Sequence, residues 1–297
     1  MLGLTISLPA FAFSLACAFA YSASDYFRKD TAQRIDAAQA LFYAFLLEMP
    51  VLALWMVLSG DVRLGASYLV PGLIAAVIGF GANLFFIIAI RKSPLSLMVP
   101  LLALVPVLTA LVSGALLGEW PRSVQSAGIV VVTAGLICLF VPAEGARHPL
   151  AVWRNLVREP GVLPMAGVVA LWSIQPPVDK ICLTYASVGL HGLIQLMVLA
   201  SAAGAWLVAR GGVQAFVLPP GAAKPLAGVA LTAGLGYGLQ LVAYQMALVA
   251  IVELIKRTVG LAGSMILGRA YFRESITPPK VVGMAIILLG LPLVLLG

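Results

Sequence analysis

The chain has 297 residues, of which 62% are hydrophobic and 10% are charged, and its mean hydropathy is +1.08. Soluble domains have roughly 45–50% apolar and 25% charged residues, so this composition excludes a soluble globular enzyme. Apolar stretches long enough to cross a bilayer recur along the whole chain, which also excludes a protein with a single membrane anchor. Runs such as 129–140 and 281–296 are continuously apolar, whereas an outer-membrane barrel needs alternating segments. We therefore predict an all-α polytopic membrane protein.

The predicted helices follow from about 20 residues per crossing, with breaks at proline, glycine and charge clusters. The first apolar segment has no Lys or Arg before it, so we interpret it as a membrane helix and not as a cleaved signal. In chain order the sequence predicts ten transmembrane helices, at 5–26, 36–59, 68–90, 94–118, 122–141, 161–183, 187–210, 222–248, 250–271 and 277–296.

Internal repetition divides the chain into two halves. A shift of 155 residues without gaps superimposes Gly79 on Gly234, Gly81 on Gly236, Glu119 on Glu274, Gly128 on Gly283 and Gly135 on Gly290. Each half holds five predicted crossings, an odd number, so the second half is inverted relative to the first. We predict repeats at 1–141 and 161–297, joined by a basic amphipathic linker at 142–160 that lies in the membrane interface. Inverted repeats are typical of secondary transporters, with the substrate site between the repeats.

The two halves resemble the EamA repeat of the drug/metabolite transporter (DMT) superfamily. The likeness is clearest in the sequences LLGE at 116–119 and YFRE at 271–274, each followed nine and sixteen residues after its glutamate by glycine. The resemblance implies a ten-helix transporter in the bacterial cytoplasmic membrane. The members that the chain resembles export amino acids and other metabolites, and eukaryotic relatives exchange nucleotide sugars or sugar phosphates. Membership does not determine the substrate.

One acidic residue lies near the centre of a predicted span. Glu48 is about twelve residues into the second helix and is followed by the helix-bending Pro50. A charged side chain inside a span costs roughly 2.5–3.5 kcal/mol and usually faces a cavity or a partner. Glu48 is therefore the candidate proton-coupling carboxylate. The alternative is a structural glutamic acid that is hydrogen-bonded to a neighbour such as Gln39 or Tyr43.

The ninth helix opens with three charged residues, Glu253, Lys256 and Arg257, whose spacing puts them on one face. The matching positions of the fourth helix, at 98, 101 and 102, are apolar. This asymmetry favours substrate recognition, because a fold requirement would act on both repeats. The pair also resembles the Lys-Arg pair of sugar-phosphate transporters, which implies contact with phosphate. The alternative is an interfacial ion cluster in which the long side chains reach the surface.

Further polar and aromatic side chains are candidates for a substrate cavity. The sixth helix carries a Pro-Pro pair at 176–177, which we expect to break the helix and free carbonyl groups. The eighth helix carries a polar-aromatic stripe. His191 stands at the start of the seventh helix, where an interfacial role is more common than a proton relay. Besides Lys256, Arg257 and Glu253, the candidate substrate-binding residues are Tyr237, Gln240, Tyr244, Gln175, Trp172, Lys180 and Asn83.

The charge and the cysteine content limit which partners and cofactors we expect. The net charge is +7, but the basic residues lie at helix ends and form no single run, so nucleic acid is not an expected partner. The three cysteines are isolated and no catalytic motif such as HExxH is present, so we expect no metal, no cofactor and no enzymatic activity. The expected partners are the bilayer, a small-molecule or lipid substrate and, in a homodimer, a second copy. A monomer is equally open.

Two predictions about orientation disagree. Most Lys and Arg residues outside the predicted spans fall on connections after odd-numbered helices, with Arg63, Arg122 and Lys180 on even-numbered ones. The positive-inside rule then puts both termini outside, whereas the resemblance implies cytoplasmic termini.

Three functions are compatible with this pattern. The first is a secondary transporter of a small polar metabolite, bearing carboxylate or phosphate, that works by alternating access. The second is a flippase or transporter of an amphipathic lipid or lipid-linked phosphate, since very apolar segments flank the basic residues. The third is a membrane-embedded transferase, which would need a carboxylate cluster with a metal. The sequence supplies polar residues at helix centres, which favours the first.

Overall fold

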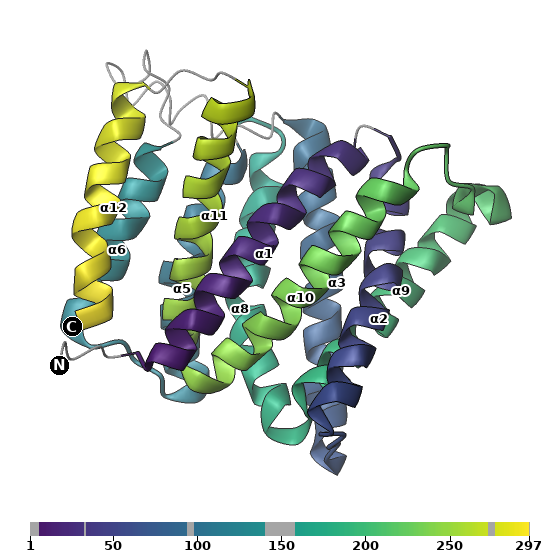
Figure 1. Cartoon of the computed structure of the whole chain (residues 1–297), viewed down its shortest axis with the longest axis horizontal. Coiled ribbons are helices and arrows are strands. Elements are labelled where there is room, and N and C mark those ends of the chain that lie inside the picture. The colour runs from purple at the N-terminus through teal and green to yellow at the C-terminus, as the bar shows by residue number, and fades with distance from the viewer. Residues whose placement is uncertain (1–5, 33, 94–97, 140–157, 273–276, 297) are drawn as a thin grey trace. The chain divides into compact units, whose positions relative to one another are not determined.

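The structure, a computed structural model, describes residues 6–32, 34–93, 98–139, 158–272 and 277–296. Within these ranges the chain forms ten α-helices and no strand (Figure 1). The helices are α1 (Leu8–Ala32), α2 (Ala37–Ser59), α3 (Leu69–Lys92), α5 (Val105–Leu117), α6 (Ser123–Cys138), α8 (Val162–Tyr185), α9 (Val188–Gly211), α10 (Ala223–Met246), α11 (Val249–Phe272) and α12 (Pro278–Leu296). The predicted all-α class is confirmed. Most of the predicted linker 142–160 lies outside the described residues.

Helix α2 shows how local sequence sets the boundaries. The Asp36 side chain accepts hydrogen bonds from the backbone N–H groups of Ala38 and Gln39, which satisfies donors that have no partner inside the helix. Gly60 ends the helix with φ of 65°, a left-handed conformation that favours glycine. The observed span agrees with the predicted range 36–59 because both of its ends are specified by nearby residues.

Two predictions about helix continuity are wrong. The fourth predicted helix, 94–118, is not one α-helix: the 3₁₀ helix η2 (Val99–Leu104) precedes α5, where Pro100 and Pro106 remove backbone donors. Conversely, α8 continues through Pro176 and Pro177, which we expected to break it. Two missing N–H donors cost two hydrogen bonds within a helix of 24 residues, and the remaining turns keep it continuous.

Five helical segments are long and apolar enough to cross a membrane by length and composition. They are Ala38–Ser59, Ala66–Phe86, Val188–Gly211, Ala223–Met246 and Pro278–Leu295. The segments Leu101–Leu117 and Ser123–Cys138 are shorter apolar helices. The chain is thus a multi-pass membrane protein, and large apolar side chains that would be costly in water, such as Leu58 and Leu289, are exposed on it.

The chain divides into two compact units. Unit 1 comprises Met1–Phe11, Gly81–Pro177 and Met246–Gly297, and unit 2 comprises Ala12–Phe80 and Val178–Gln245. Each unit therefore takes residues from both predicted repeats, and α1, α3, α8 and α10 contribute residues to both units.

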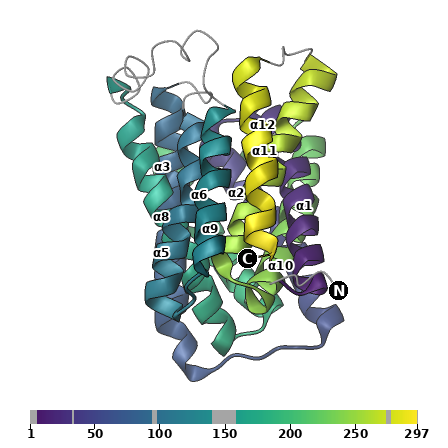
Figure 2. The same cartoon turned by 90° about the vertical axis from the view of Figure 1, so that its left-hand side faces the viewer.

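Unit 1 contains a close helix pair, α6 and α12, which lie side by side in Figures 1 and 2. A Cβ atom on Gly135 would lie 2.8 Å from the carbonyl oxygen of Gly283, and one on Gly283 would lie 2.7 Å from that of Gly135. Gly128 and Gly290 are equally crowded, against Val294 and Val132. Glycine lets membrane helices approach at this distance, so these four glycines have a packing role.

Unit 2 contains a second close pair, α2 and α9. A Cβ atom on Gly189 would lie 2.7 Å from Cα of Met56, and one on Gly192 would lie 2.8 Å from Cδ1 of Leu52. Leu52 and Met56 are four residues apart and share one face of α2 with Glu48, which lies one turn before Leu52. The Glu48 face of α2 is therefore the face that packs on α9.

Candidate functional site

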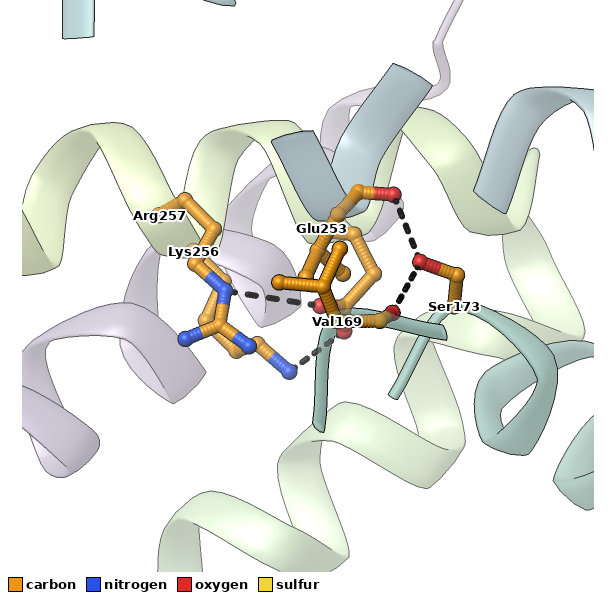
Figure 3. Close-up of polar contacts among 6 residues, drawn as sticks. Val169, Ser173, Glu253, Lys256 and Arg257 are labelled. Atoms are coloured by element: carbon orange, nitrogen blue, oxygen red, sulfur yellow. Dashed lines mark hydrogen bonds and ion pairs between the residues drawn. The ribbon is translucent and has the colours of Figure 1, made fainter. Parts of the chain in front are cut away.

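Three charged residues near the start of α11 (Val249–Phe272) form one cluster in unit 1, which we call the cation cluster (Glu253, Lys256 and Arg257). Lys256 donates a hydrogen bond from Nζ to Oε1 of Glu253, and Arg257 Nε lies 4.0 Å from Oε2 of the same carboxylate. Both cations point to this carboxylate in Figure 3. The predicted common face is confirmed, because the i, i+3, i+4 spacing on one helix produces these two ion pairs.

The cation cluster carries one positive charge in excess. Two cations share one carboxylate, and the Glu253 side chain is 1% exposed, against 15% for Lys256 and 20% for Arg257. Nε of Arg257 is buried and has no hydrogen-bond partner among the described residues, since 4.0 Å is beyond hydrogen-bond distance. A buried donor without a partner is costly. Nε of Arg257 can therefore still donate a hydrogen bond to an acceptor atom of a ligand.

An aromatic side chain lies beside this guanidinium. The Arg257 Cζ atom lies 5.3 Å from the centre of the Trp172 ring, within the range of a cation–π interaction. Trp172 in turn lies 5.5 Å from Phe86 and packs against an apolar cluster that includes Met98, Leu102 and Val105. Trp172 thus has apolar residues to one side and the charged head of Arg257 to the other, and it restricts the positions that the guanidinium can take.

Two hydrogen bonds fix the helices of this site. The backbone N–H of Val249, the first residue of α11, donates to Oε2 of Glu119 at 3.2 Å. The Glu119 carboxylate therefore lies at the N-terminus of α11, where negative charge is favourable. Ser173, beside Trp172, donates to the Val169 carbonyl at 2.6 Å and lies 3.4 Å from that of Val105, which ties α8 to α5 (Figure 3).

The segment that matches the cation cluster in the first repeat also lies in unit 1. Met98, Leu101 and Leu102 belong to or pack against the apolar cluster below Trp172. The two matched segments therefore contribute opposite chemistry to the same unit, one apolar and one cationic.

The remaining predicted substrate-binding residues are distributed over both units. Asn83 and Gln175 are half-buried in unit 1, in α3 and α8. In unit 2, Lys180 is half-buried in α8, whereas Gln240 and Tyr244 are buried in α10. Tyr237 of α10 interacts electrostatically with Asp179, its strongest charged neighbour. The structure thus brings Trp172 to the cation cluster and places Tyr237 near a different acid.

Glu48, the predicted proton-coupling residue, lies in unit 2. Its side chain is 5% exposed, and Arg28 of α1 is the cation that interacts with it electrostatically. Sequence reasoning identified the acid but not this partner.

A second polar group in unit 2 was missed by sequence reasoning. We call it the His191 network: Tyr68, Asp179, His191 and Gln195, all buried. The Tyr68 hydroxyl lies 2.8 Å from Nδ1 of His191, and the Gln195 amide nitrogen donates to that hydroxyl at 3.3 Å. Nε2 of His191 lies 3.4 Å from Oδ1 of Asp179. The imidazole of His191, which we expected near the membrane interface, is fully buried among side chains of unit 2. The four-residue spacing of His191 and Gln195 was the available signal.

The described residues contain no group of three His, Cys, Asp or Glu side chains that could hold a metal ion.

Known proteins are similar to part or all of this chain. Residues 8–141 match the model of the EamA-like transporter family, so this part of the chain is similar to membrane transporters of that family. No curated protein matches the chain. A solved structure described as "Crystal structure of protein" is similar over 96% of this chain and 95% of its own, with a TM-score of 0.75 and 18% sequence identity. At this identity the likeness concerns the fold alone.

Proposed function

We propose that the chain is a secondary active transporter of a small polar metabolite that bears a carboxylate or phosphate group. The observation that carries the proposal is the excess positive charge of the cation cluster, with a buried Arg257 Nε that has no hydrogen-bond partner among the described residues. Keeping two cations in a membrane protein is costly unless negative charge compensates them. Glu253 compensates one, and an anionic substrate would compensate the other.

The side-chain types suit an anion. Arginine offers paired donors that match carboxylate and phosphate oxygens, whereas lysine offers a point charge. Lys256 is held by Glu253 at one oxygen, and Arg257 faces the other oxygen only at 4.0 Å. Arg257 is therefore the residue whose N–H donors can bind a substrate. Trp172 lies beside its guanidinium and limits the movement of that group.

The proposed mechanism is alternating access of two inverted five-helix repeats. The ten α-helices of the described residues and the repetition at a shift of 155 residues support this arrangement. Glu48 is the proposed coupling carboxylate, since it is a buried acid in a helix apolar enough to span the membrane. We propose the bacterial cytoplasmic membrane as the location.

A ligand screen sorted by charge tests the proposal. The purified protein is heated with panels of carboxylates, phosphates, neutral sugars, organic cations and short-chain lipid phosphates, and the shift in melting temperature is recorded. A ligand that binds only the folded state raises its stability in proportion to RT ln(1 + [L]/Kd). We expect stabilisation by soluble anions. Stabilisation by cations alone would contradict an anion site. Stabilisation by the lipid phosphates alone would indicate that the substrate is a lipid and not a soluble metabolite.

A further inference from the structure

The His191 network lies at one end of unit 2, close to where two spans begin. Tyr68 is the third residue of the span Ala66–Phe86, and His191 is the fourth residue of the span Val188–Gly211. Two backbone hydrogen bonds hold the connecting segments together: Gly65 N–H donates to the Tyr185 carbonyl at 2.7 Å, and Ser187 N–H donates to that of Arg63 at 2.9 Å. Asp61 and Arg63 on the same connection are exposed. Tyr68 and His191 are thus buried and lie within about a turn of the start of their spans, whereas Gln195 lies one turn deeper.

The hydrogen bonds of the network have a consistent direction. Gln195 donates from its amide nitrogen both to the Tyr68 oxygen and to the carbonyl of Gly72, the latter at 3.0 Å. The Tyr68 hydroxyl is then free to donate to Nδ1 of His191. A neutral imidazole has one donor and one acceptor nitrogen, so Nε2 carries the hydrogen; it lies 3.4 Å from Oδ1 of Asp179 without a hydrogen bond between the two atoms. In this state His191 is neutral.

One more proton changes this direction. When Nδ1 of His191 gains a proton, both ring nitrogens become donors, and Nδ1–H must donate to the Tyr68 oxygen. The Tyr68 hydroxyl must then turn its hydrogen away from Nδ1 and donate it to another acceptor. Oε1 of Gln195 is buried and has no hydrogen-bond partner among the described residues, and rotation of the amide would bring it to Tyr68. Asp179, 3.4 Å from Nε2, stabilises the imidazolium.

Among the described residues, three further ionisable groups lie close to Asp179 or Tyr68 of the network. Besides Asp179, α8 contributes Cys182, which interacts electrostatically with both Asp179 and Tyr68. Helix α10 contributes Tyr237. Tyr21 of α1 is the next neighbour of Tyr237.

The face of α2 that packs on α9 is apolar where it lies beside His191. Leu52 and Met56 face Gly192 and Gly189, on either side of His191 along α9. Glu48 is the acid of this face, one turn beyond Leu52. Asp179 is thus the one carboxylate that the described contacts place beside His191.

We propose that His191, with Asp179 and Tyr68, is a proton-binding site: His191 takes up a proton from the aqueous boundary, and the Tyr68 hydrogen bond reverses. The proposal deepens the proposed function, on which it rests, since a proton bound here is available as the coupling ion. Gln195 links the event to α3, because the amide that binds Tyr68 also binds the Gly72 carbonyl. No bond other than hydrogen bonds breaks, and the proton remains on the imidazole until it is released.

The sequence allows a direct test, because it contains two histidines, His148 and His191. In the full-length His148→Gln variant, ¹³C NMR of labelled histidine and tyrosine reports on His191 alone and on Tyr68, whose signal is assigned by its loss in Tyr68→Phe. Histidine is the side chain whose ordinary pKa lies between pH 5 and 8. We expect reversible signal changes of His191 and Tyr68 that share one common midpoint. In His191→Gln the Tyr68 step should vanish.

Asp179→Asn should change the His191 midpoint, whereas the exposed Asp61→Asn control should leave it in place. A His191 signal that is constant from pH 5 to 8, a Tyr68 signal that does not follow it, or equal midpoints in the two aspartate variants would overturn the proposal. The test needs no anion and uses the proton as its probe. Failure of every anion to bind would therefore sink the proposed function separately from this site.

Discussion

The cation cluster of unit 1 and the His191 network of unit 2 are built in opposite ways. In the cation cluster, two flexible and partly exposed cations share one buried acid and leave a positive excess. In the His191 network, buried side chains from three elements lie around one acid, and hydrogen bonds join Gln195 to Tyr68 and Tyr68 to His191. The first arrangement suits a ligand with several oxygen atoms, and the second suits a ligand no larger than a proton.

This difference shows how burial decides what a charged site can bind. Partly exposed Lys and Arg side chains can change conformation to fit a substrate. Their hydrogen bonds to the substrate strengthen once water is excluded. Buried groups that already contact one another favour small changes, such as the gain or loss of hydrogen and the rotation of a polar group. The predictions below test whether the two regions are as independent as this comparison requires.

The largest effect is expected from Glu253→Gln. Removing the shared acid leaves two cations with reduced compensation, and breaking a buried pair in this way costs about 3–5 kcal/mol, here at the lower end because both cations are partly exposed. The melting temperature should fall, and added anion should restore more stability to the variant than to the wild type. Glu159→Gln, which alters a hydrogen bond from Ser93 in the same unit, is the control. Equal stability of wild type and Glu253→Gln would show that the cations do not depend on this acid.

An intermediate effect is expected from Trp172→Leu, which keeps an apolar contact but removes the aromatic face beside Arg257. A cation–π contact contributes about 0.5–2 kcal/mol, so anion affinity should fall roughly two- to thirtyfold in a binding isotherm. The matched control is Trp206→Leu in unit 2, where Arg210 lies 4.2 Å from the ring centre. An equal loss in both variants would contradict a specific role for Trp172.

The smallest effect on anion affinity is expected from Glu48→Gln. The amide keeps the shape of the side chain but is not ionisable in this pH range. The affinity for the anion should therefore stay within about twofold of the wild type, whereas the pH dependence of transport into proteoliposomes should be lost. Leu52→Ile, on the same face of α2, is a control for packing. A Gln variant that transports with the wild-type pH profile would return Glu48 to a structural role.

Much of the fold could be predicted because its determinants are local. Asp36 and Gly60 mark the ends of α2, and the spacing of Glu253, Lys256 and Arg257 puts them on one face. The 3₁₀ segment before α5 and the continuous α8 were missed, since proline position alone does not say whether a helix breaks or tolerates the lost hydrogen bonds.

The His191 network could not be predicted from such patterns. Tyr68 and His191 are 123 residues apart, and their contact depends on how the connection before α3 pairs with the turn between α8 and α9. Only the α9 part of the network, His191 and Gln195, has a local spacing, and that spacing does not name a partner. For the same reason the sequence identified Glu48 but not Arg28, which lies on another helix.

The most direct test of the account is an isotherm for the best anion of the charge-sorted screen, measured on wild type, Arg257→Ala and Arg257→Lys. A charge-assisted contact contributes roughly 1.5–3 kcal/mol, so Arg257→Ala should weaken binding about ten- to a hundredfold. Arg257→Lys should recover part of the loss, because it restores the charge but not the paired donors. Arg210→Ala, in unit 2, should bind like the wild type. Equal affinities of wild type and Arg257→Ala would contradict an anion site at the cation cluster.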